Sequence, residues 1–178
     1  EGVIRLLGLH RTRQEDVTEE ERQSLSAEGE KAGVIEEEER DMIQSVMRLG
    51  DRSVKAIMTP RTEVIWLDPD TAREELLKEI TDSGHSRFPV YEGKRDNVIG
   101  ILMAKDLLKL QRAPELNLRT LLRPAVFVPE SKRLNELLRD FRSNRNHLAI
   151  VIDEFGNTAG LITIEDVLEE IVGEIEDE

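Results

Sequence analysis

The sequence predicts a mixed α/β (α+β) fold in which one unit of strand, helix, strand, strand and helix occurs twice. Residues 84–108 (GHSRFPVYEGKRDNVIGILMAKDLL) align with residues 144–168 (NRNHLAIVIDEFGNTAGLITIEDVL) at a constant offset of 60 residues, which places Asp106 on Asp166. A repeated supersecondary unit cannot bury its apolar face alone. We therefore expect the two copies to pack together as a pseudo-twofold pair.

Composition excludes several classes of protein. The 178 residues include no Cys, so the chain has neither a disulfide framework nor a thiolate metal site. A net charge of -13 argues against nucleic acid as a partner, because nucleic-acid-binding domains carry basic patches. The acidic excess lies at the two ends: the net charge is -6 in residues 1–53, +1 in residues 54–164 and -8 in residues 165–178.

Residues 1–52 are predicted to form an N-terminal helical segment. Apolar residues between 3 and 9 do not form a signal peptide. Thr18 and Glu21 have the spacing of a capping box, and Gly33 is placed to end the helix that follows. A second helix is expected from the helical spacing of Ile35, Met42, Val46 and Leu49, with Gly50 at its C-terminal cap.

Four consecutive acids open this second helix. Glu36, Glu37, Glu38 and Glu39 complement the dipole at a helix N-terminus, and this is the simpler interpretation. The alternative is an acidic patch that senses a cation such as Mg²⁺, since hard cations prefer several oxygen ligands. No spacing in this segment is typical of a Mg²⁺ or Ca²⁺ loop.

The first copy, residues 53–113, shows clear local patterns. Alternating and β-branched residues predict strands, and apolar residues at helical spacing predict a helix with Leu76, Leu77 and Ile80 facing inward. The expected elements are a strand at 64–67, a turn and N-cap at 68–71, a helix at 72–82, strands at 88–91 and 98–103 around a polar turn at 92–97, and a helix at 105–110.

The second copy, residues 114–178, repeats this order. We expect a strand and turn at 125–131, a helix at 134–141, a strand and turn at 147–157, a strand at 158–163 and an acidic C-terminal helix from 164 to 173.

Several motifs together resemble a known family. They are EEEERDMIQSVMRLGD (36–51), IMTPRTEV (57–64), GHSRFPV (84–90), GILMAKDLL (100–108), HLAIVIDEFG (147–156) and GLITIEDVLEEIVGEIEDE (160–178). The repeat resembles a tandem pair of CBS domains, and the set resembles the CorC/CNNM (haemolysin-like) group of magnesium and cobalt transport or efflux proteins. The resemblance implies the cytosolic portion of a membrane protein, on the cytoplasmic side of the membrane, whose own membrane domain is absent from this chain.

The two copies differ where a ligand site is expected. The second copy has a hydroxyl and a carboxylate three residues apart, Thr163 and Asp166, where the first has Met103 and Asp106. A capping box explains this spacing by itself. The functional interpretation adds a ribose diol bound by the carboxylate beside backbone N–H groups, and the resemblance implies that contact. Ile162 is expected to join the same site.

The first copy carries the complementary motif at its strand entry. Ser86 offers a hydroxyl, Arg87 a planar donor fork suited to phosphate, and Phe88 a flat apolar face, while Pro89 holds the strand rigidly. The alternative is an ordinary buried strand with Phe88 in the core and Arg87 in solvent. The resemblance implies a nucleotide-binding segment that also includes His85, and Thr59 is expected to join from the preceding linker. The opposite cleft, with Met103 and His147, is expected to be poor or empty.

Enzymatic readings have little support. His10, His85 and His147 have no metal-ligand spacing, and there is no phosphate-loop or nucleophile-elbow motif. We expect a regulatory module, not an enzyme, that binds ATP or another adenine nucleotide with Mg²⁺ and forms a homodimer. The dimer is expected to bury the apolar faces of the terminal helices: Leu107, Leu108, Val167, Leu168 and Ile171. The alternatives are a ligand-free dimerisation module and a metal-dependent hydrolase.

Overall fold

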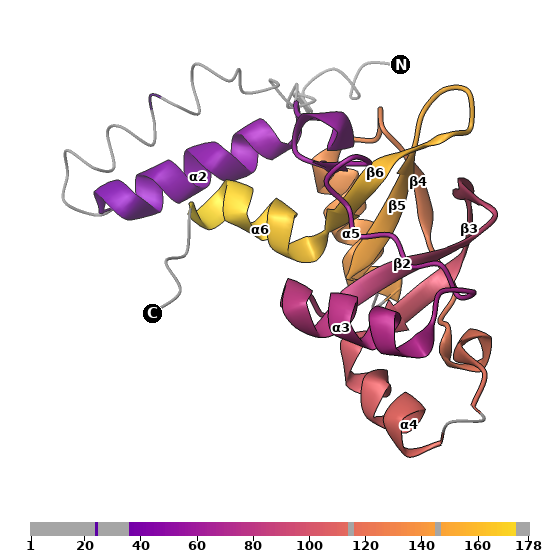
Figure 1. The fold of residues 1–178 in the computed structure, drawn as a ribbon. Coiled ribbons are helices and arrows are strands. Elements are labelled where there is room, and N and C mark those ends of the chain that lie inside the picture. Colours follow the sequence, from indigo (N-terminus) through magenta and orange to yellow (C-terminus); the bar gives the residue numbers. More distant parts are fainter. Residues whose placement is uncertain (1–23, 25–35, 114–115, 145–146, 174–178) are drawn as a thin grey trace, which may run out of the picture. The chain divides into compact units, whose positions relative to one another are not determined.

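The computed structural model describes Ser24 and residues 36–113, 116–144 and 147–173 (Figure 1). The chain divides into two compact units, Glu1–Gln44 and Ser45–Glu178. In the first unit, Ser24 is helical, and the rest of the helix expected between residues 18 and 33 lies outside the described residues, as do residues 3–9. The second unit contains both copies of the repeat.

Helix α2 (Glu37–Leu49) matches the second helix expected near the N-terminus. Its first turn carries Glu37, Glu38 and Glu39, and Leu49 is buried at its end. The carboxylate of Glu39 accepts a hydrogen bond from the backbone N–H of Glu36 at 3.1 Å. These carboxylates therefore stabilise the N-terminus of α2, where the helix dipole favours negative charge.

The first copy folds largely as expected. It begins with the short strand β1 (Thr59–Pro60), followed by α3 (Arg73–Ser83), β2 (Arg87–Glu92), β3 (Lys94–Met103) and α4 (Leu107–Arg112). A 3₁₀ turn at Ala104–Asp106 lies directly before α4. β2 and β3 form an antiparallel pair. Within the predicted 92–97 turn, Gly93 adopts a left-handed conformation (φ 71°), and the pairing shifts from Tyr91 with Val98 to Glu92 with Lys94.

Two expectations for this copy are wrong. Residues 64–67 do not form a strand: only Leu67 forms a bridge, with Val90, and the Trp66 indole N–H donates to the carbonyl of Arg61 (2.9 Å) in the turn that precedes the segment. The side chains of residues 68–71 do not cap α3, whose N-cap is Ala72. Asp68 instead accepts from the backbone N–H of Asp70 at 2.9 Å, within the turn.

The second copy repeats the order with a larger sheet. Its elements are β4 (Phe127–Pro129), α5 (Leu134–Asn144), β5 (Leu148–Ile152), β6 (Thr158–Thr163) and α6 (Ile164–Val172). The strand order in the sheet is β1-β6-β5-β4, with β4 and β5 parallel and the other pairs antiparallel. The mixed fold with two repeated units is confirmed.

Each copy's entry segment pairs with the sheet of the other copy. β1 lies near the start of the first copy but pairs with β6 of the second, while Arg123, near the start of the second copy, bridges Ile101 of β3 in the first. Glycine makes both approaches feasible. A Cβ atom on Gly160 would lie 2.1 Å from the Thr59 carbonyl oxygen, and one on Gly100 would lie 2.8 Å from that of Arg123.

Three clusters of apolar side chains hold these layers together. One lies among β4, β5, β6, α5 and α6, and a second lies among α3, β2 and β3. The third joins the two sheets through Ile101 of β3 and Leu148, Ile150 and Leu161 of β5 and β6. Burial of this third cluster packs the two copies against each other.

Candidate functional site

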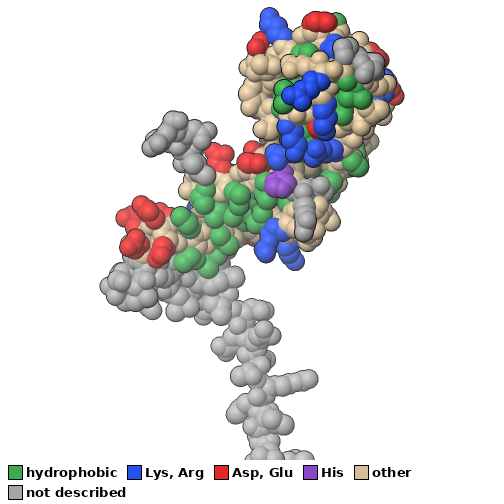
Figure 2. All heavy atoms as spheres, turned by 90° about the horizontal axis from the view of Figure 1, so that it is seen from below, with side chains coloured by type: hydrophobic (Ala, Val, Ile, Leu, Met, Phe, Trp, Pro, Cys, Tyr) green, Lys and Arg blue, Asp and Glu red, His purple; other side chains and the backbone are tan. Residues whose placement is uncertain are grey.

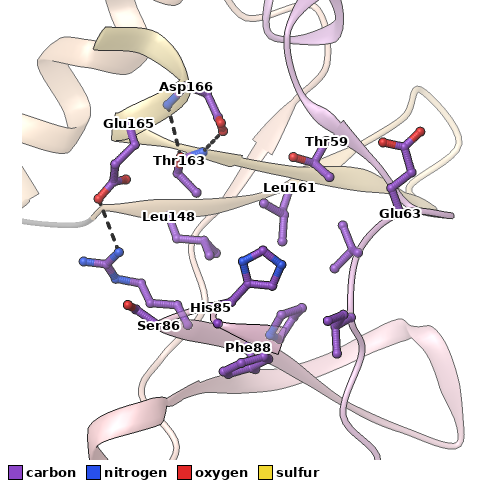
Figure 3. Close-up of a pocket in the computed structure, with 15 residues that line it drawn as sticks. Thr59, Glu63, His85, Ser86, Phe88, Leu148, Leu161, Thr163, Glu165 and Asp166 are labelled. Carbon is purple, nitrogen blue, oxygen red and sulfur yellow. Dashed lines mark hydrogen bonds and ion pairs between the residues drawn. The ribbon is translucent and has the colours of Figure 1, made fainter. Parts of the chain in front are cut away.

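A cavity of about 370 Å³ opens between the two copies (Figure 3). This volume lies within the range of small-molecule sites. Its walls come from the entry segment, the start of β2, the two central strands of the larger sheet and the start of α6. The lining residues are Thr59, Glu63, Val64, Ile65, Gly84, His85, Ser86, Arg87, Phe88, Pro89, Leu148, Leu161, Thr163, Glu165 and Asp166.

The second copy contributes a capped helix start. The Thr163 hydroxyl accepts from the Asp166 backbone N–H at 3.2 Å, and Asp166 Oδ2 accepts from the Thr163 backbone N–H at 2.7 Å. The predicted capping box is therefore confirmed. Asp166 Oδ1 makes no hydrogen bond with any residue that the structure describes, so this oxygen remains to accept one from a ligand hydroxyl.

The first copy contributes the start of β2. Gly84, with φ 71°, ends α3 and turns the chain toward the cavity. The Ser86 carbonyl accepts from the Ala104 backbone N–H at 2.9 Å, which ties this entry to the end of β3. The Arg87 guanidinium lies 3.5 Å from the Glu165 carboxylate of the second copy, a long ion pair across the cavity (Figure 3).

At the start of β2, the apolar side chains face the core more than the cavity. Phe88 is only 1% exposed and packs in the cluster of α3, β2 and β3. Its ring therefore supports the wall and offers little free face to a base. The exposed His85 ring lies edge-on to it, with centroids 6.3 Å apart, and Figure 3 shows His85 within the cavity.

The residues predicted from sequence meet in this cavity, with one exception. Thr59, His85, Ser86, Arg87, Phe88, Pro89, Thr163 and Asp166 all line it. Ile162 does not, because its side chain is fully buried in the core of the second copy. Successive residues of a strand point to opposite faces, so Leu161 and Thr163 line the cavity and Ile162 faces away.

Sequence reasoning missed the apolar wall and two acids. Val64, Ile65, Leu148 and Leu161 line the cavity, and so do Glu63 and Glu165. The leucines carried no distinguishing signal, because any strand residue of this kind is first read as core. Glu63 stands three residues after Pro60 in the motif already quoted, and its place in the linker beside Thr59 was the available signal.

The carboxylate equivalent to Asp166 in the first copy is already occupied. Asp106 is 3% exposed and lies 2.6 Å from Lys109 Nζ and 3.4 Å from Arg123 Nη2. The hydrogen bond from Lys109, aided by both cations, holds the Asp106 pKa below its usual value although burial opposes this. The two copies therefore present a free acceptor on one side and a neutralised one on the other.

Within the described residues, no group of three or more His, Asp or Glu side chains is placed to hold a metal ion. Glu36, Glu37, Glu38 and Glu39 belong to these residues and are all exposed. Nor does any helix in the same part of the chain have the length and apolarity needed to cross a membrane.

The family model for the CBS domain matches residues 54–113 and 118–173. The magnesium and cobalt efflux protein CorC of Pasteurella multocida is 50% identical over 161 residues, which cover 89% of this chain and 54% of that protein. The chain thus spans about half the length of this curated relative.

Two solved structures are also similar. The CBS domain of a bacterial CNNM/CorC family Mg²⁺ transporter superposes with a TM-score of 0.83 at 41% identity, covering 90% of this chain and 99% of that chain. A structure of such a domain in complex with ATP superposes with a TM-score of 0.72 at 42% identity, covering 77% of this chain and 99% of that one.

Proposed function

The chain belongs to the CBS-domain family and, within it, to the CNNM/CorC group of magnesium transport proteins, and from this premise we propose that its cavity binds an adenine nucleotide, as ATP with Mg²⁺. One observation carries the proposal. The cavity joins Thr163 and Asp166 of the second copy to Ser86 and Arg87 of the first. The ATP complex of a similar domain supports the choice of nucleotide.

The residues fit the parts of a nucleotide. Asp166 Oδ1 has no partner among the described residues and would accept from a ribose hydroxyl. The apolar wall that includes Val64 and Leu161 suits a base. Ser86 and Arg87 supply a hydroxyl and a donor fork for phosphate oxygens.

Electrostatics favours the Mg²⁺ complex over free ATP. Arg87 is the cation in the cavity wall, and the Glu165 carboxylate lies 3.5 Å from it, with Asp166 one residue further on. Two unit charges ~4 Å apart interact by about 1 kcal/mol in water and by more near a protein surface. A triphosphate must therefore face two carboxylates, and Mg²⁺ bound to its phosphates would lower that repulsion without a protein cage.

In the parent protein, this chain acts as a regulatory module. It lies on the cytoplasmic side of the membrane and forms a homodimer. Nucleotide in the cavity stabilises one arrangement of the two copies, and the dimer passes that arrangement to the membrane domain. Support for the membrane partner comes from the efflux proteins that the chain resembles, about half of whose length it spans.

Isothermal titration calorimetry with ATP, ADP and AMP, with and without millimolar Mg²⁺, tests the proposal. We expect Mg²⁺ to strengthen ATP binding at least about tenfold, which is about 1.4 kcal/mol, and to leave AMP binding almost unchanged because AMP carries fewer charges. Equal ATP affinity in excess chelator would contradict the role of Mg²⁺. Absence of binding by all three nucleotides would indicate a structural dimerisation module, and release of phosphate from ATP would indicate a hydrolase.

A further inference from the structure

The cavity has two chemically different ends. Its polar end carries Arg87, Thr163, Glu165 and Asp166, and its other end is formed by residues 63–65 with Leu161. Val64 packs against the cluster that contains Leu148 and Leu161, so the wall at that end is apolar. Glu63 is the single ionisable residue among those described at this end, and Figure 3 shows it across the cavity from Glu165 and Asp166.

We infer that Glu63 is the residue that selects the base, by accepting a hydrogen bond from the exocyclic amine of adenine. This inference rests on the proposed binding of adenine nucleotide in the same cavity. With the ribose held at Asp166, the far edge of the purine points toward residues 63–65. In adenine, that edge carries an amine at C6, whose N–H donates a hydrogen bond to a carboxylate. In hypoxanthine or guanine it carries a carbonyl at C6, whose oxygen a carboxylate repels.

The turn that carries Glu63 is firmly held. The Glu63 backbone N–H donates to the Pro60 carbonyl at 2.9 Å, and the Arg61 N–H donates to the Ala159 carbonyl of the second copy at 2.8 Å. The Arg61 side chain also pairs with Asp96 at 2.6 Å, and the buried Trp66 donates to the Arg61 carbonyl at 2.9 Å. The backbone of this turn therefore has a restricted position, from which the exposed Glu63 side chain can reach the base end of the cavity.

The Glu63 carboxylate is also available. It makes no hydrogen bond or ion pair with any residue that the structure describes, unlike Glu165, which pairs with Arg87. An ionised carboxylate accepts hydrogen bonds and donates none, so it distinguishes ligands by the donors they bring. Glu63 therefore acts at the base, and its contribution is separable from that of Asp166 at the ribose.

The test compares ATP with purine riboside 5′-triphosphate, which lacks the amine, by calorimetry in Mg²⁺ with the whole chain. We expect the wild type to bind ATP about tenfold more tightly than the amine-free nucleotide, the scale of one hydrogen bond to a charged group. In Glu63→Ala the two affinities should become equal within about twofold. Glu154→Ala removes an exposed acid that does not line the cavity and should keep the wild-type ratio.

The affinity ratio separates this inference from the proposed function. If the wild type binds both nucleotides equally, or if Glu63→Ala changes both affinities by the same factor, the role of Glu63 is wrong while nucleotide binding stands. Tighter binding of GTP than of ATP would also overturn it, because the carboxylate would then face the N–H groups of guanine. If the wild type binds none of these nucleotides, the proposed function fails and this inference fails with it.

Discussion

Asp166 and Asp106 show how two equivalent residues acquire different roles. Thr59 and Glu169 each line a cavity together with Asp166. Lys109 corresponds to Glu169 at the offset of 60 residues, and Arg123 corresponds to Thr59 at an offset of 64, which aligns Pro60 with Pro124. Both of these cations lie against the Asp106 carboxylate. Each oxygen of the Asp106 carboxylate has a cation partner, and the residue is only 3% exposed, so it is poorly placed to bind a ligand. The exchange of a few side chains thus leaves one of the two carboxylates available to bind a ligand.

A prediction at this scale separates the two carboxylates. Asp166→Ala should weaken adenine-nucleotide binding by about 1.5–3 kcal/mol, the range of a hydrogen bond to a charged group, and Asp106→Ala should leave it almost unchanged. Calorimetry measures both. Asp166→Asn is the control for the helix cap, because its amide oxygen still accepts from the Thr163 N–H, and unfolding should be followed for each variant. Equal losses in Asp166→Ala and Asp106→Ala would contradict a single ribose site.

At the scale of elements, the pairing of β1 with β6 positions one wall of the cavity. Pro60 pairs with Gly160 and Thr59 with Leu161, and both Thr59 and Leu161 line the cavity. Residues 63–65 lie shortly after β1 in the chain, so the pairing of β1 with β6 also sets their position. The absence of a side chain at Gly160 is therefore required by the cavity as well as by the core.

Gly160→Ala should test this dependence. Its Cβ would lie 2.1 Å from the Thr59 carbonyl oxygen, a backbone atom that can yield only if β1 leaves β6. We expect a loss of about 1–3 kcal/mol in the free energy of unfolding, measured by denaturant titration, together with weaker ATP binding.

Gly50→Ala is the matched control for this change. Its Cβ would meet its nearest atoms, the Met47 carbonyl oxygen and Asn135 Nδ2, at ordinary distances of 3.5 and 3.6 Å. Its stability should stay within about 0.5 kcal/mol of wild type. A Gly160→Ala protein as stable as this control, with unchanged ATP affinity, would show that the close approach is not needed.

At the scale of the whole molecule, exposed apolar side chains point to association. Figure 2 shows hydrophobic side chains at the surface on the face that it draws. Leu108 of α4 is 59% exposed and Leu168 of α6 is 42% exposed, and we expect a partner to cover both. Val167, expected from sequence in the same interface, is fully buried within its own chain and cannot contribute.

We predict that the chain forms a dimer through these two helices. Sedimentation at tens of micromolar should show a dimer for the wild type and a shift toward monomer for Leu108→Glu and Leu168→Glu, because each places a charge in an apolar contact. Phe155→Ser is the control, since Phe155 is 81% exposed but belongs to the turn between β5 and β6. A monomeric wild type, with and without nucleotide, would refute the homodimer.

Features that depend on neighbouring residues could be predicted from the sequence. The repeat, the helices α3, α5 and α6, the hairpin strands and the capping box at Thr163 all follow from local periodicity and spacing. The meeting of the 86–89 and 163–166 motifs was also expected, because a repeat of this kind packs as a pair. Where the local signals competed, the prediction failed, as at residues 64–67, where the Trp66 side chain bonds back to Arg61 and only Leu67 pairs with a strand.

The sequence by itself determined that the chain contains two copies of one unit, and which motifs of each copy differ. Only the tertiary structure decided that Ile162 faces the core while Leu161 faces the cavity, that Arg123 pairs with Asp106, and that Glu63 lines the cavity. The physical reason is register. Strand pairing between segments about a hundred residues apart sets which face each side chain takes, and a shift of one residue would reverse it.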